Sequence, residues 1–313
     1  MGKLFGTDGI RGIVGENLTA ELAYRIGQAV TMVLWEENGK APLITIGMDT
    51  RISSDMLESA MISGICSVGG SVMPLGVIPT PAVAYLTMEV QADAGVVISA
   101  SHNPFQHNGI KVFNGKGYKL SDELEDEIEN ILMSCPEILP SPTGIGLGTK
   151  GYAEEALDDY LAFLTKTTKE KFSGIKVALD CANGAAYKAA PLAMLDLGAQ
   201  LCIIHNEPDG TNINDKCGST HMEDLKKLVV ENGADIGFAF EVKTQGKEAM
   251  TLLCGVDNSG KIVKIDIISE SETPDYKKQV FPLVLGDQGA YNGKDSDSLD
   301  KLLVTGATLT SDG

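Results

Sequence analysis

Short apolar runs alternate with longer amphipathic segments from the start of the chain to about residue 135. The runs Leu43–Gly47, Ser71–Val77 and Ala94–Ala100 are typical of buried strands. Before and between them, Thr19–Trp35 and Ser54–Val68 carry apolar residues at helical spacing. Because strands that alternate with helices form βαβ units, the pattern predicts an α/β domain with a mixed or parallel sheet.

A helix and a linker follow this first pattern. Ser121–Leu132 has a Ser at its start and carboxylates in its first turn, which indicates a capped helix with a solvated acidic face. Pro136, Pro140 and Pro142 lead into a Gly-rich stretch that ends at Gly151, and Ala153–Thr165 returns to helical spacing. We therefore predict a first domain over residues 1–140 and a linker over residues 141–151.

A second alternation of strands and helices fills residues 152–240. It predicts a second α/β domain of the same kind as the first. In chain order, the expected elements are the strand Lys176–Asp180, the helix Ala185–Leu197, the strand Gln200–His205, the helix Met222–Glu231 and the strand Asp235–Phe240.

The pattern changes after Phe240. Leu252–Val256 and Ile262–Ile268 are typical of strands, and Asn258–Gly260 between them is typical of a hairpin turn. Since no helical segment separates the two strands, the βαβ spacing is lost. We predict that residues 241–313 form a separate small unit of a different, α+β kind.

The chain has 313 residues, which is room for about two domains. Its formal net charge of −18 opposes general binding to nucleic-acid phosphates, although a locally basic pocket for a phosphorylated small molecule stays open. No stretch approaches the roughly 18 apolar residues of a membrane helix, and Asp8 and Arg11 stand where a signal peptide needs an apolar run. We expect a cytoplasmic protein without nucleic-acid or membrane partners. The sequence leaves its oligomeric state open.

The six cysteines lie far apart and form no Cys-x-x-Cys motif. This spacing suggests neither a disulfide framework nor a zinc site, so most of them are expected to be small buried hydrophobes. Cys217 and His221 have the spacing of metal ligands, but no further Cys or His lies near them in the sequence. We therefore expect no zinc there.

The segment Ile98–Pro104 carries the most specific chemistry of the chain. It places the side chains of Ser99, Ser101 and His102 at the carboxyl end of a predicted strand, where open α/β sheets bind ligands. Lys111 follows closely and can return a cation to the same loop. A polar turn explains the residues equally well on composition alone. A Gly-x-Ser-x-Gly elbow is missing, which argues against a serine hydrolase and favours a serine that handles phosphate.

The opening segment Phe5–Gly12 packs glycines around Thr7, Asp8 and Arg11. Such a loop lets backbone N–H groups and a guanidinium approach an anion. Turns of this composition are common, so the segment indicates anion binding only because it occurs together with Ile98–Pro104.

Together these segments resemble the bacterial phosphoglucosamine mutases of the α-D-phosphohexomutase superfamily over residues 1–240. The resemblance implies phosphohexomutase-type α/β domains and the conversion of glucosamine 6-phosphate to glucosamine 1-phosphate, with a hexosamine phosphate as the bound partner. The segments that carry it are Lys3–Gly12, Ile98–Pro104, Asn108–Lys111, Asp180–Ala186 and Asn206–His221.

The resemblance also implies roles for single residues. Ser101 would be the phosphoserine and one oxygen ligand of a Mg²⁺ ion, with His102 and Lys111 acting at the transferring group and Arg11 holding phosphate. The remaining contacts to substrate or phosphate would come from Thr7, Asp8, Gly9 and Asn103.

One part of the family pattern is replaced. An Asp-Gly-Asp-Ala-Asp-Arg magnesium loop should follow Phe240, and Glu241–Gly246 stands in its place with a single carboxylate. The length of the chain also leaves no room for the family's sugar-recognition and C-terminal phosphate-binding domains. We therefore expect a second domain truncated before its metal loop and an impaired mutase.

The last part of the chain resembles the FMN-binding domain of the G subunit of Rnf ion-pumping complexes and of its Nqr counterpart. The segments are Gly255–Val263, Ser269–Pro274 and Thr305–Ser311. The resemblance implies that Thr308 would carry FMN through a phosphoester, within a motif that includes Thr305 and Gly306. Leu302 stands where that family usually has Asp, which argues against flavin attachment.

The two resemblances leave several hypotheses for function. The first is an impaired phosphoglucosamine mutase-like enzyme, and the others are an FMN-carrying electron-transfer module and a non-catalytic phosphosugar-binding remnant. Because the mutase pattern stops within a motif, we interpret the step from Phe240 to Glu241 as a junction of two unrelated coding sequences, either biological or an error of assembly.

Overall fold

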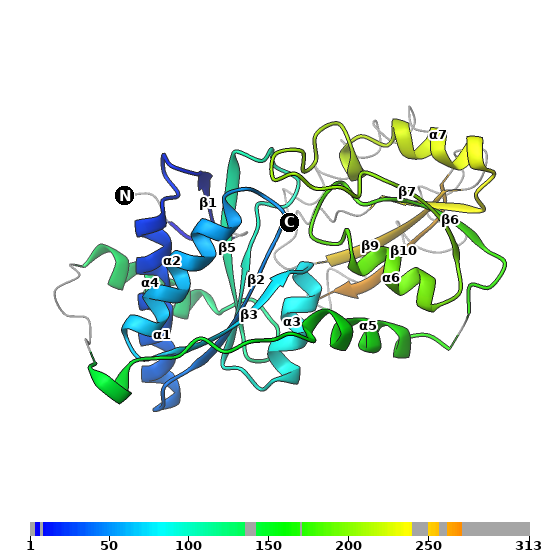
Figure 1. Ribbon diagram of the computed structural model, residues 1–313. Helices are drawn as coiled ribbons and strands as arrows, with labels where there is room; N and C mark the ends of the chain where they lie inside the picture. The colour runs from blue at the N-terminus through cyan, green and yellow to red at the C-terminus, as the bar shows by residue number, and fades with distance from the viewer. Residues whose placement is uncertain are drawn as a thin grey trace. The chain divides into compact units, whose positions relative to one another are not determined.

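The computed structural model describes residues 4–6, 9–134, 142–169, 171–239, 250–256 and 262–270, the last two as backbone only. The chain divides into two compact units (Figure 1). The first comprises Met1–Thr167 and Pro208–Ile213, and the second comprises Thr168–Glu207 and Asn214–Gly313. The division after Thr167 lies later in the chain than the predicted linker over residues 141–151.

The sheet of the first unit has five strands in the order β1-β5-β4-β2-β3. β2 is parallel to both β3 and β4, whereas β5 is antiparallel to β4 and β1. The prediction of a mixed or parallel sheet is confirmed, in its mixed form. The strands are β1 (Ile10–Ile13), β2 (Leu43–Met48), β3 (Ser71–Val77), β4 (Ala94–Ile98) and β5 (His107–Asn114).

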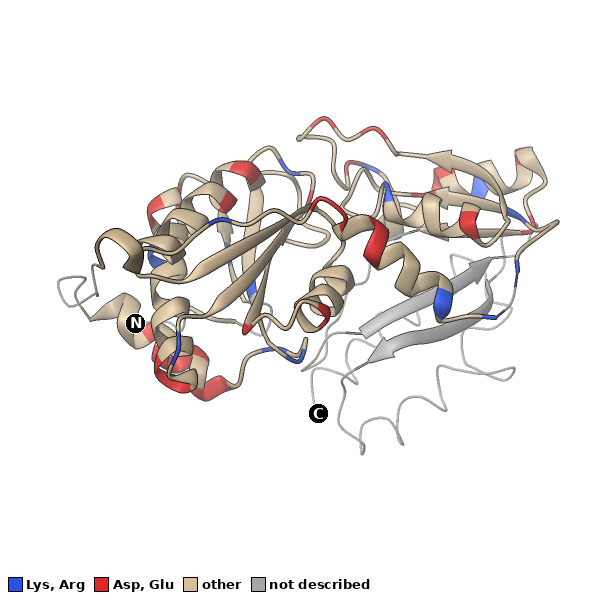
Figure 2. Cartoon of the chain, turned by 60° about the horizontal axis from the view of Figure 1, so that its bottom comes forward, with Lys and Arg blue, Asp and Glu red and all other residues tan. Residues whose placement is uncertain are grey.

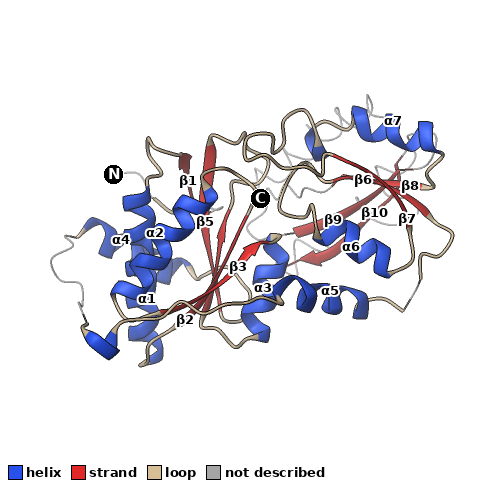
Figure 3. Cartoon of the chain, viewed as in Figure 1, coloured by secondary structure: helices blue, strands red, loops and turns tan. Residues whose placement is uncertain are grey.

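Helices cover both faces of this sheet (Figure 3). α1, α2 and α4 group on one face, where their apolar sides share a core with the strands, and α3 lies on the other face. α5 packs against α3 through stacked rings of Tyr85 and Phe163, whose centroids are 3.9 Å apart. The helices are α1 (Ala20–Asn38), α2 (Ser54–Ser67), α3 (Thr80–Glu89), α4 (Asp122–Met133) and α5 (Ala156–Lys166), with a short 3-10 turn η2 (Gly144–Gly146).

Local sequence explains how α1 begins, ends and packs. The Thr19 hydroxyl accepts a hydrogen bond from the Leu22 N–H at 3.1 Å, and Gly39 ends the helix with a φ of 67°. α1 then approaches α2 closely, because a Cβ added at Gly64 would lie only 2.0 Å from the Tyr24 carbonyl oxygen. This close packing holds α2, whose first residues belong to the site described below.

The second unit also has a five-stranded mixed sheet, in the order β10-β9-β8-β6-β7. β6 is parallel to β7 and β8, and β9 is antiparallel to β8 and β10. The two strands predicted after residue 240 form and pair antiparallel with each other, and the first of them pairs with β8 at Gly237. The elements are β6 (Lys176–Asp180), α6 (Ala189–Asp196), β7 (Gln200–Ile204), the 3-10 turn η3 (Gly218–Thr220), α7 (Glu223–Asn232), β8 (Ile236–Ala239), β9 (Met250–Val256) and β10 (Ile262–Glu270).

The described surface agrees with the acidic composition. Asp and Glu are spread over the helices of both units, with a dense group on α4 (Figure 2). Within the described ranges, no helix combines the length and the apolar character that crossing a bilayer requires. Cys181 and Cys217 are buried, as the sequence predicts, whereas Cys66 and Cys202 are only partly so. The side chains of the other cysteines fall outside the described residues.

Candidate functional site

The topology of the first sheet brings two polar segments to one edge. β2 and β4 are parallel neighbours, so the residues that follow them meet at the carboxyl edge of the sheet. Asp49 follows β2, and its N–H donates to the carbonyl of Ile98, the last residue of β4, at 3.0 Å. The loop Ser99–Asn103 therefore starts directly beside Asp49.

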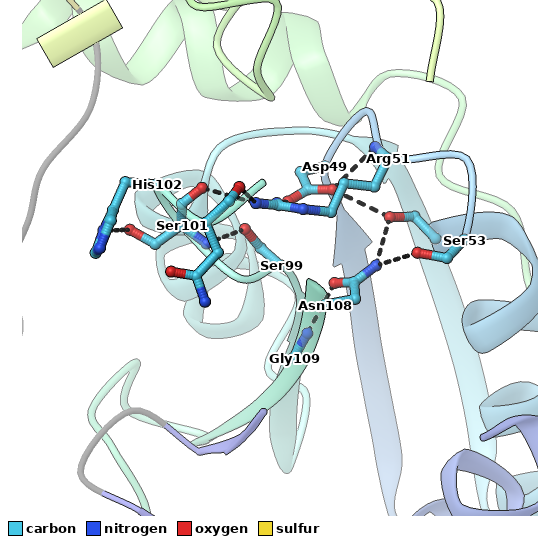
Figure 4. A network of polar contacts seen from close by, with 10 residues as sticks. Asp49, Arg51, Ser53, Ser99, Ser101, His102, Asn108 and Gly109 are labelled. Carbon is cyan, nitrogen blue, oxygen red and sulfur yellow. Dashed lines mark hydrogen bonds and ion pairs between the residues drawn. The ribbon is translucent and has the colours of Figure 1, made fainter. Parts of the chain in front are cut away.

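Ser101 lies in this loop in an unusual backbone conformation. Its φ is +54°, in the left-handed region that residues other than glycine seldom adopt. Its N–H donates to the Ser99 hydroxyl at 3.1 Å, and its own hydroxyl oxygen lies 3.5 Å from Nδ1 of His102 (Figure 4). The side chain is half-buried. Strained residues of this kind concentrate at functional sites, where the surrounding structure holds them.

A buried ion pair holds the loop. The guanidinium of Arg51 binds the carboxylate of Asp49, and the two residues are only 2% and 3% exposed. The same guanidinium donates to the backbone carbonyl of Ser101 at 3.0 Å and to that of Asn103 at 2.6 Å (Figure 4). One cation therefore links the end of β2 to the backbone of the serine loop on both sides of His102.

Asn108 extends this network to β5 and α2. Its Nδ2 donates to the hydroxyls of Ser53 and Ser54 at 3.0 and 3.1 Å, and its Oδ1 accepts from the Gly109 N–H at 2.8 Å. Ser54 in turn donates to Asp49 at 3.1 Å (Figure 4). The start of α2 and the start of β5 are thus fixed to the same carboxylate.

Arg11 and Lys111 share one face of the sheet. Arg11 on β1 is paired with Gly109 on β5, and Lys111 lies two residues further along β5. Paired residues and residues two apart in a strand point to the same face. A Cβ at Gly109 would lie 3.0 Å from Cγ of Arg11 and 2.8 Å from the Ser99 carbonyl oxygen. The missing side chain at Gly109 is what allows Arg11 to lie against the residues of the serine loop.

The opening glycine-rich turn lies beside the same strand. Gly6 and Gly9 exchange backbone hydrogen bonds of 3.1 and 3.2 Å. Gly9 has a φ of +80°, and a Cβ there would lie 2.4 Å from the Ile110 carbonyl oxygen and 3.0 Å from Cγ of Lys111. Only glycine allows this approach. Thr7 and Asp8, which the resemblance assigns to phosphate binding, fall outside the described residues.

The structure thus brings together part of the predicted site. Ser101, His102 and Asn103 share one loop, and Arg11, Gly9 and Lys111 share a neighbouring region of the sheet. The residues predicted for FMN, Thr305, Gly306 and Thr308, lie outside the described part of the chain, as does the segment 241–246.

Sequence reasoning missed Asp49 and Arg51, and it assigned no role to Asn108. A usable signal was present, since Asp49 and Arg51 follow a buried parallel strand directly. Chemically, the arrangement presents a hydroxyl, an imidazole and two cations, which suits the transfer of an anionic phosphoryl group.

Two family profiles match different parts of the chain. Phosphoglucomutase/phosphomannomutase alpha/beta/alpha domain I matches residues 2–137, and the FMN-binding domain matches residues 246–313. The first match contains the whole network around Ser101. The second supports the predicted fusion with an FMN-binding type of domain.

Relatives of known name match a longer stretch. The phosphoglucosamine mutase of Ruminiclostridium cellulolyticum is 58% identical over 268 residues, 86% of this chain and 58% of the relative. That of Acetivibrio thermocellus is 54% identical over 279 residues, 89% of this chain and 61% of the relative. The chain therefore spans about three-fifths of these mutases. A match of 268 residues cannot end before residue 268, so it overlaps the FMN-binding match, which begins at residue 246.

Solved structures agree on the fold. A phosphoglucomutase/phosphomannomutase family protein from Burkholderia thailandensis superposes with a TM-score of 0.69 at 23% identity, covering 84% of this chain and 56% of the other. Parafusin, a phosphoglucomutase from Paramecium, gives 0.65 at 18% identity, with 84% and 54% covered. At these identities the comparison establishes the phosphohexomutase fold alone.

Replacing Arg51 should destabilise the first unit strongly. Arg51→Ala leaves the buried Asp49 without its cation, and breaking a buried ion pair in this way costs about 3–5 kcal/mol. The free energy of unfolding can be measured by denaturant titration, with fluorescence of Trp35, the single tryptophan, reporting on α1 of this unit.

Lys40→Ala provides the matched control for this measurement. Lys40 is 65% exposed and pairs with Asp93 at 3.1 Å on the surface, so its loss should cost no more than about 1 kcal/mol. Equal costs for the two variants would show that the Asp49–Arg51 pair does not hold the unit together.

Proposed function

Given that residues 2–137 belong to the phosphoglucomutase/phosphomannomutase family, we propose that this chain transfers a phosphoryl group between Ser101 and a hexosamine phosphate. The observation that carries the proposal is the left-handed Ser101, whose loop Arg51 holds at the carboxyl edge of the sheet. The hexosamine is proposed because the relatives at 58% and 54% identity are phosphoglucosamine mutases. We also propose a cytoplasmic location, as the sequence predicts.

The proposed step is a single displacement at phosphorus. The Ser101 oxygen attacks one phosphorus of a sugar 1,6-bisphosphate, a new P–O bond forms, and the P–O bond to the sugar breaks. The serine hydroxyl loses its proton, for which Nδ1 of His102 at 3.5 Å is the nearby acceptor, and the departing sugar oxygen gains one. In the reverse step, phosphoserine returns its phosphoryl group to the other oxygen of a sugar monophosphate.

Charge and position supply most of the catalysis in such a transfer, because the negative charge is spread over the equatorial oxygens. We assign Arg11 and Lys111 to those oxygens, since both cations lie on the face of the sheet beside the loop. We assign Gly9 and Asn103, together with Thr7 and Asp8, to substrate and phosphate contacts, as the resemblance implies.

The residues present do not fit the magnesium ion that the family implies. The sequence offers Glu241 as the single carboxylate among residues 241–246, and Lys243 adds a positive charge two residues later. Mg²⁺ binds through carboxylate and other oxygen ligands, and this segment offers one carboxylate where the family pattern has three. The proposed transfer therefore depends on the side chains of this chain, and we propose that complete isomerisation is impaired.

A second candidate function follows from the match of the FMN-binding domain to residues 246–313. A flavin esterified to Thr308 would make the chain an electron carrier. The motif departs from its family at Leu302, so we propose the mutase-type function first. If the chain binds the phosphosugar but Ser101 does not react, the protein is a phosphosugar-binding remnant without turnover.

Ser101 should become phosphorylated when the purified chain is incubated with glucosamine 1,6-bisphosphate. With the bisphosphate in excess, one transfer per chain accumulates even if it is slow, because little sugar monophosphate is present to take the phosphoryl group back. Intact-mass and peptide analysis should place it on Ser101, and Ser101→Ala should take up none. Phosphate found reproducibly on Ser99 or Ser219, with Ser101 unmodified, contradicts the assignment.

Steady-state isomerisation should be far slower than in a complete mutase. Loss of the charge stabilisation by a metal is worth several kcal/mol, so the rate should fall on the order of a thousandfold or more. A coupled assay of glucosamine 6-phosphate with Mg²⁺ and the bisphosphate primer measures this, with the R. cellulolyticum enzyme as the control. Comparable rates would mean that Glu241 or another group restores the metal site.

Covalent FMN should be missing from the purified chain. Leu302 replaces the Asp that usually precedes the attachment motif, so a flavin-transferring enzyme should not recognise Thr308. In-gel flavin fluorescence after denaturing electrophoresis tests this, with Thr308→Val alongside. A fluorescent band in the unmodified chain that vanishes in Thr308→Val would favour the electron-transfer function instead.

A further inference from the structure

The second unit contains a group of potential metal ligands that the proposed function does not use. Asp180 ends β6, His205 directly follows β7, and Cys217 precedes the turn η3. One ligand atom from each residue lies within 4.8 Å of the other two. These residues belong to one compact unit, so their arrangement does not depend on the first unit.

The fold explains why residues so far apart in sequence converge. β6 and β7 are parallel neighbours in which Asp180 pairs with Ile204, so His205 emerges beside Asp180 at the carboxyl edge. The Gly218 N–H donates to Oδ2 of Asp180 at 2.9 Å, which brings the loop of Cys217 to the same place. Gly218 has a φ of +75°, and a Cβ there would lie 2.7 Å from Cβ of Ala182.

The geometry within the group suits a bound cation. Asp180 is fully buried and Cys217 is 1% exposed. Nδ1 of His205 lies 3.0 Å from Oδ1 of Asp180, yet it is buried and forms no hydrogen bond of suitable angle with any described residue. The other ring nitrogen, Nε2, lies 3.7 Å from the carboxylate of Asp224. A carboxylate behind the imidazole is the usual orienting partner of a metal-binding histidine.

The backbone around the group is strained. Such conformations are unfavourable for residues other than glycine and persist only where the surrounding structure holds them. Residues other than glycine with positive φ in the loops that surround the group are Ala182 (51°), Asn183 (49°), His205 (50°), Asn214 (58°) and Lys216 (54°).

We propose that Asp180, His205 and Cys217 bind a divalent transition ion of the zinc type. A set of one carboxylate, one imidazole and one thiolate is a zinc set and does not suit Mg²⁺ or Ca²⁺. Ligand atoms on a tetrahedral ion with bonds of about 2.0–2.3 Å lie about 3.3–3.7 Å apart. The three ligand atoms here lie within 4.8 Å of one another, so small shifts of the side chains bring them to this spacing. Three protein ligands leave the fourth position to water.

The ligands differ from the pair that spacing in the sequence suggested. His221 follows Cys217 by one helical turn's spacing, but its Nδ1 lies 3.2 Å from the Thr220 hydroxyl instead. The absence of zinc was predicted because no third ligand lies nearby in sequence. Asp180 and His205 become neighbours of Cys217 only through the pairing of β6 with β7.

The competing explanation is a metal-free polar core. Asp180 accepts the N–H groups of Ala182 and Gly218 at 2.9 Å each, and its pairing with His205 can organise the loops alone. In that case Cys217 stays a neutral thiol, since burial, followed by the charge of Asp180, raises its pKa to about 12. A bound metal ion displaces the thiol proton and forms a metal–sulfur bond, whereas a metal-free polar core forms none.

Titration of the purified full chain with Co²⁺ as a spectroscopic probe distinguishes them. We expect one ion to bind per chain and to give the near-ultraviolet absorption of a cobalt–thiolate bond. Zn²⁺ should then displace the Co²⁺ and remove this absorption. Cys217→Ser should abolish this absorption and His205→Gln should weaken binding by tenfold or more. Cys202→Ser and His221→Gln are the matched controls and should retain full binding.

Circular dichroism of each variant checks that it is folded. Ion binding by Cys217→Asp, which restores an anionic ligand, distinguishes the loss of a ligand from the loss of folding. The proposal is overturned if the unmodified chain shows no cobalt–thiolate absorption, or if the absorption survives in Cys217→Ser. Either result is independent of Ser101 and of the proposed transferase function.

Discussion

The ion pair between Asp49 and Arg51 is the interaction on which the first unit's site depends. Burying two charges carries a large desolvation cost, which is offset only where each charge is also well hydrogen-bonded. Here Asp49 accepts from the Arg51 N–H and the Ser54 hydroxyl, and Arg51 donates to two carbonyls of the serine loop. The pair thereby joins the end of β2, the start of α2 and the loop after β4. The strained φ of Ser101 can persist because its backbone is held from outside the loop.

The two units place polar residues by the same rule. In each, two parallel neighbours, β2 with β4 and β6 with β7, end at one edge, and the residues that follow them meet there. The first edge holds the hydroxyl of Ser101, the imidazole of His102 and the guanidinium of Arg51, and the second holds a carboxylate, an imidazole and a thiol. β9 and β10 extend the second sheet, although the FMN-binding match begins before them at residue 246. The transition between the two family resemblances thus falls within one continuous sheet.

The hydrophobic pattern predicted the helices that have one apolar face and the strands that are short apolar runs. β3 and β6 have the predicted bounds, and α1 and α2 differ from the prediction only at their ends. α3 was missed because most of its residues are apolar on its exposed side as well as on its buried side, so no helical period stands out in Thr80–Glu89. β5 was missed because its polar start, His107–Asn108, resembles a loop, and that polarity serves the site. The serine loop could be predicted since its residues are contiguous. The place of Arg51 directly after a buried strand was a usable signal, but its contacts with the serine loop arise only from strand pairing. The group around Asp180 could not be predicted, because strand pairing alone brings its residues together.

The central claim is that the fold places cations beside Ser101 to receive a phosphoryl group. The most direct measurement is the single-turnover rate of Ser101 phosphorylation by glucosamine 1,6-bisphosphate in Lys111→Met, compared with Lys116→Met. Lys111 shares the face of Arg11, whereas Lys116 is exposed in the turn after β5. Removing one group that stabilises the transferring charge should slow the reaction on the order of a hundredfold in Lys111→Met and leave Lys116→Met unchanged. Equal rates in the two variants would contradict the account.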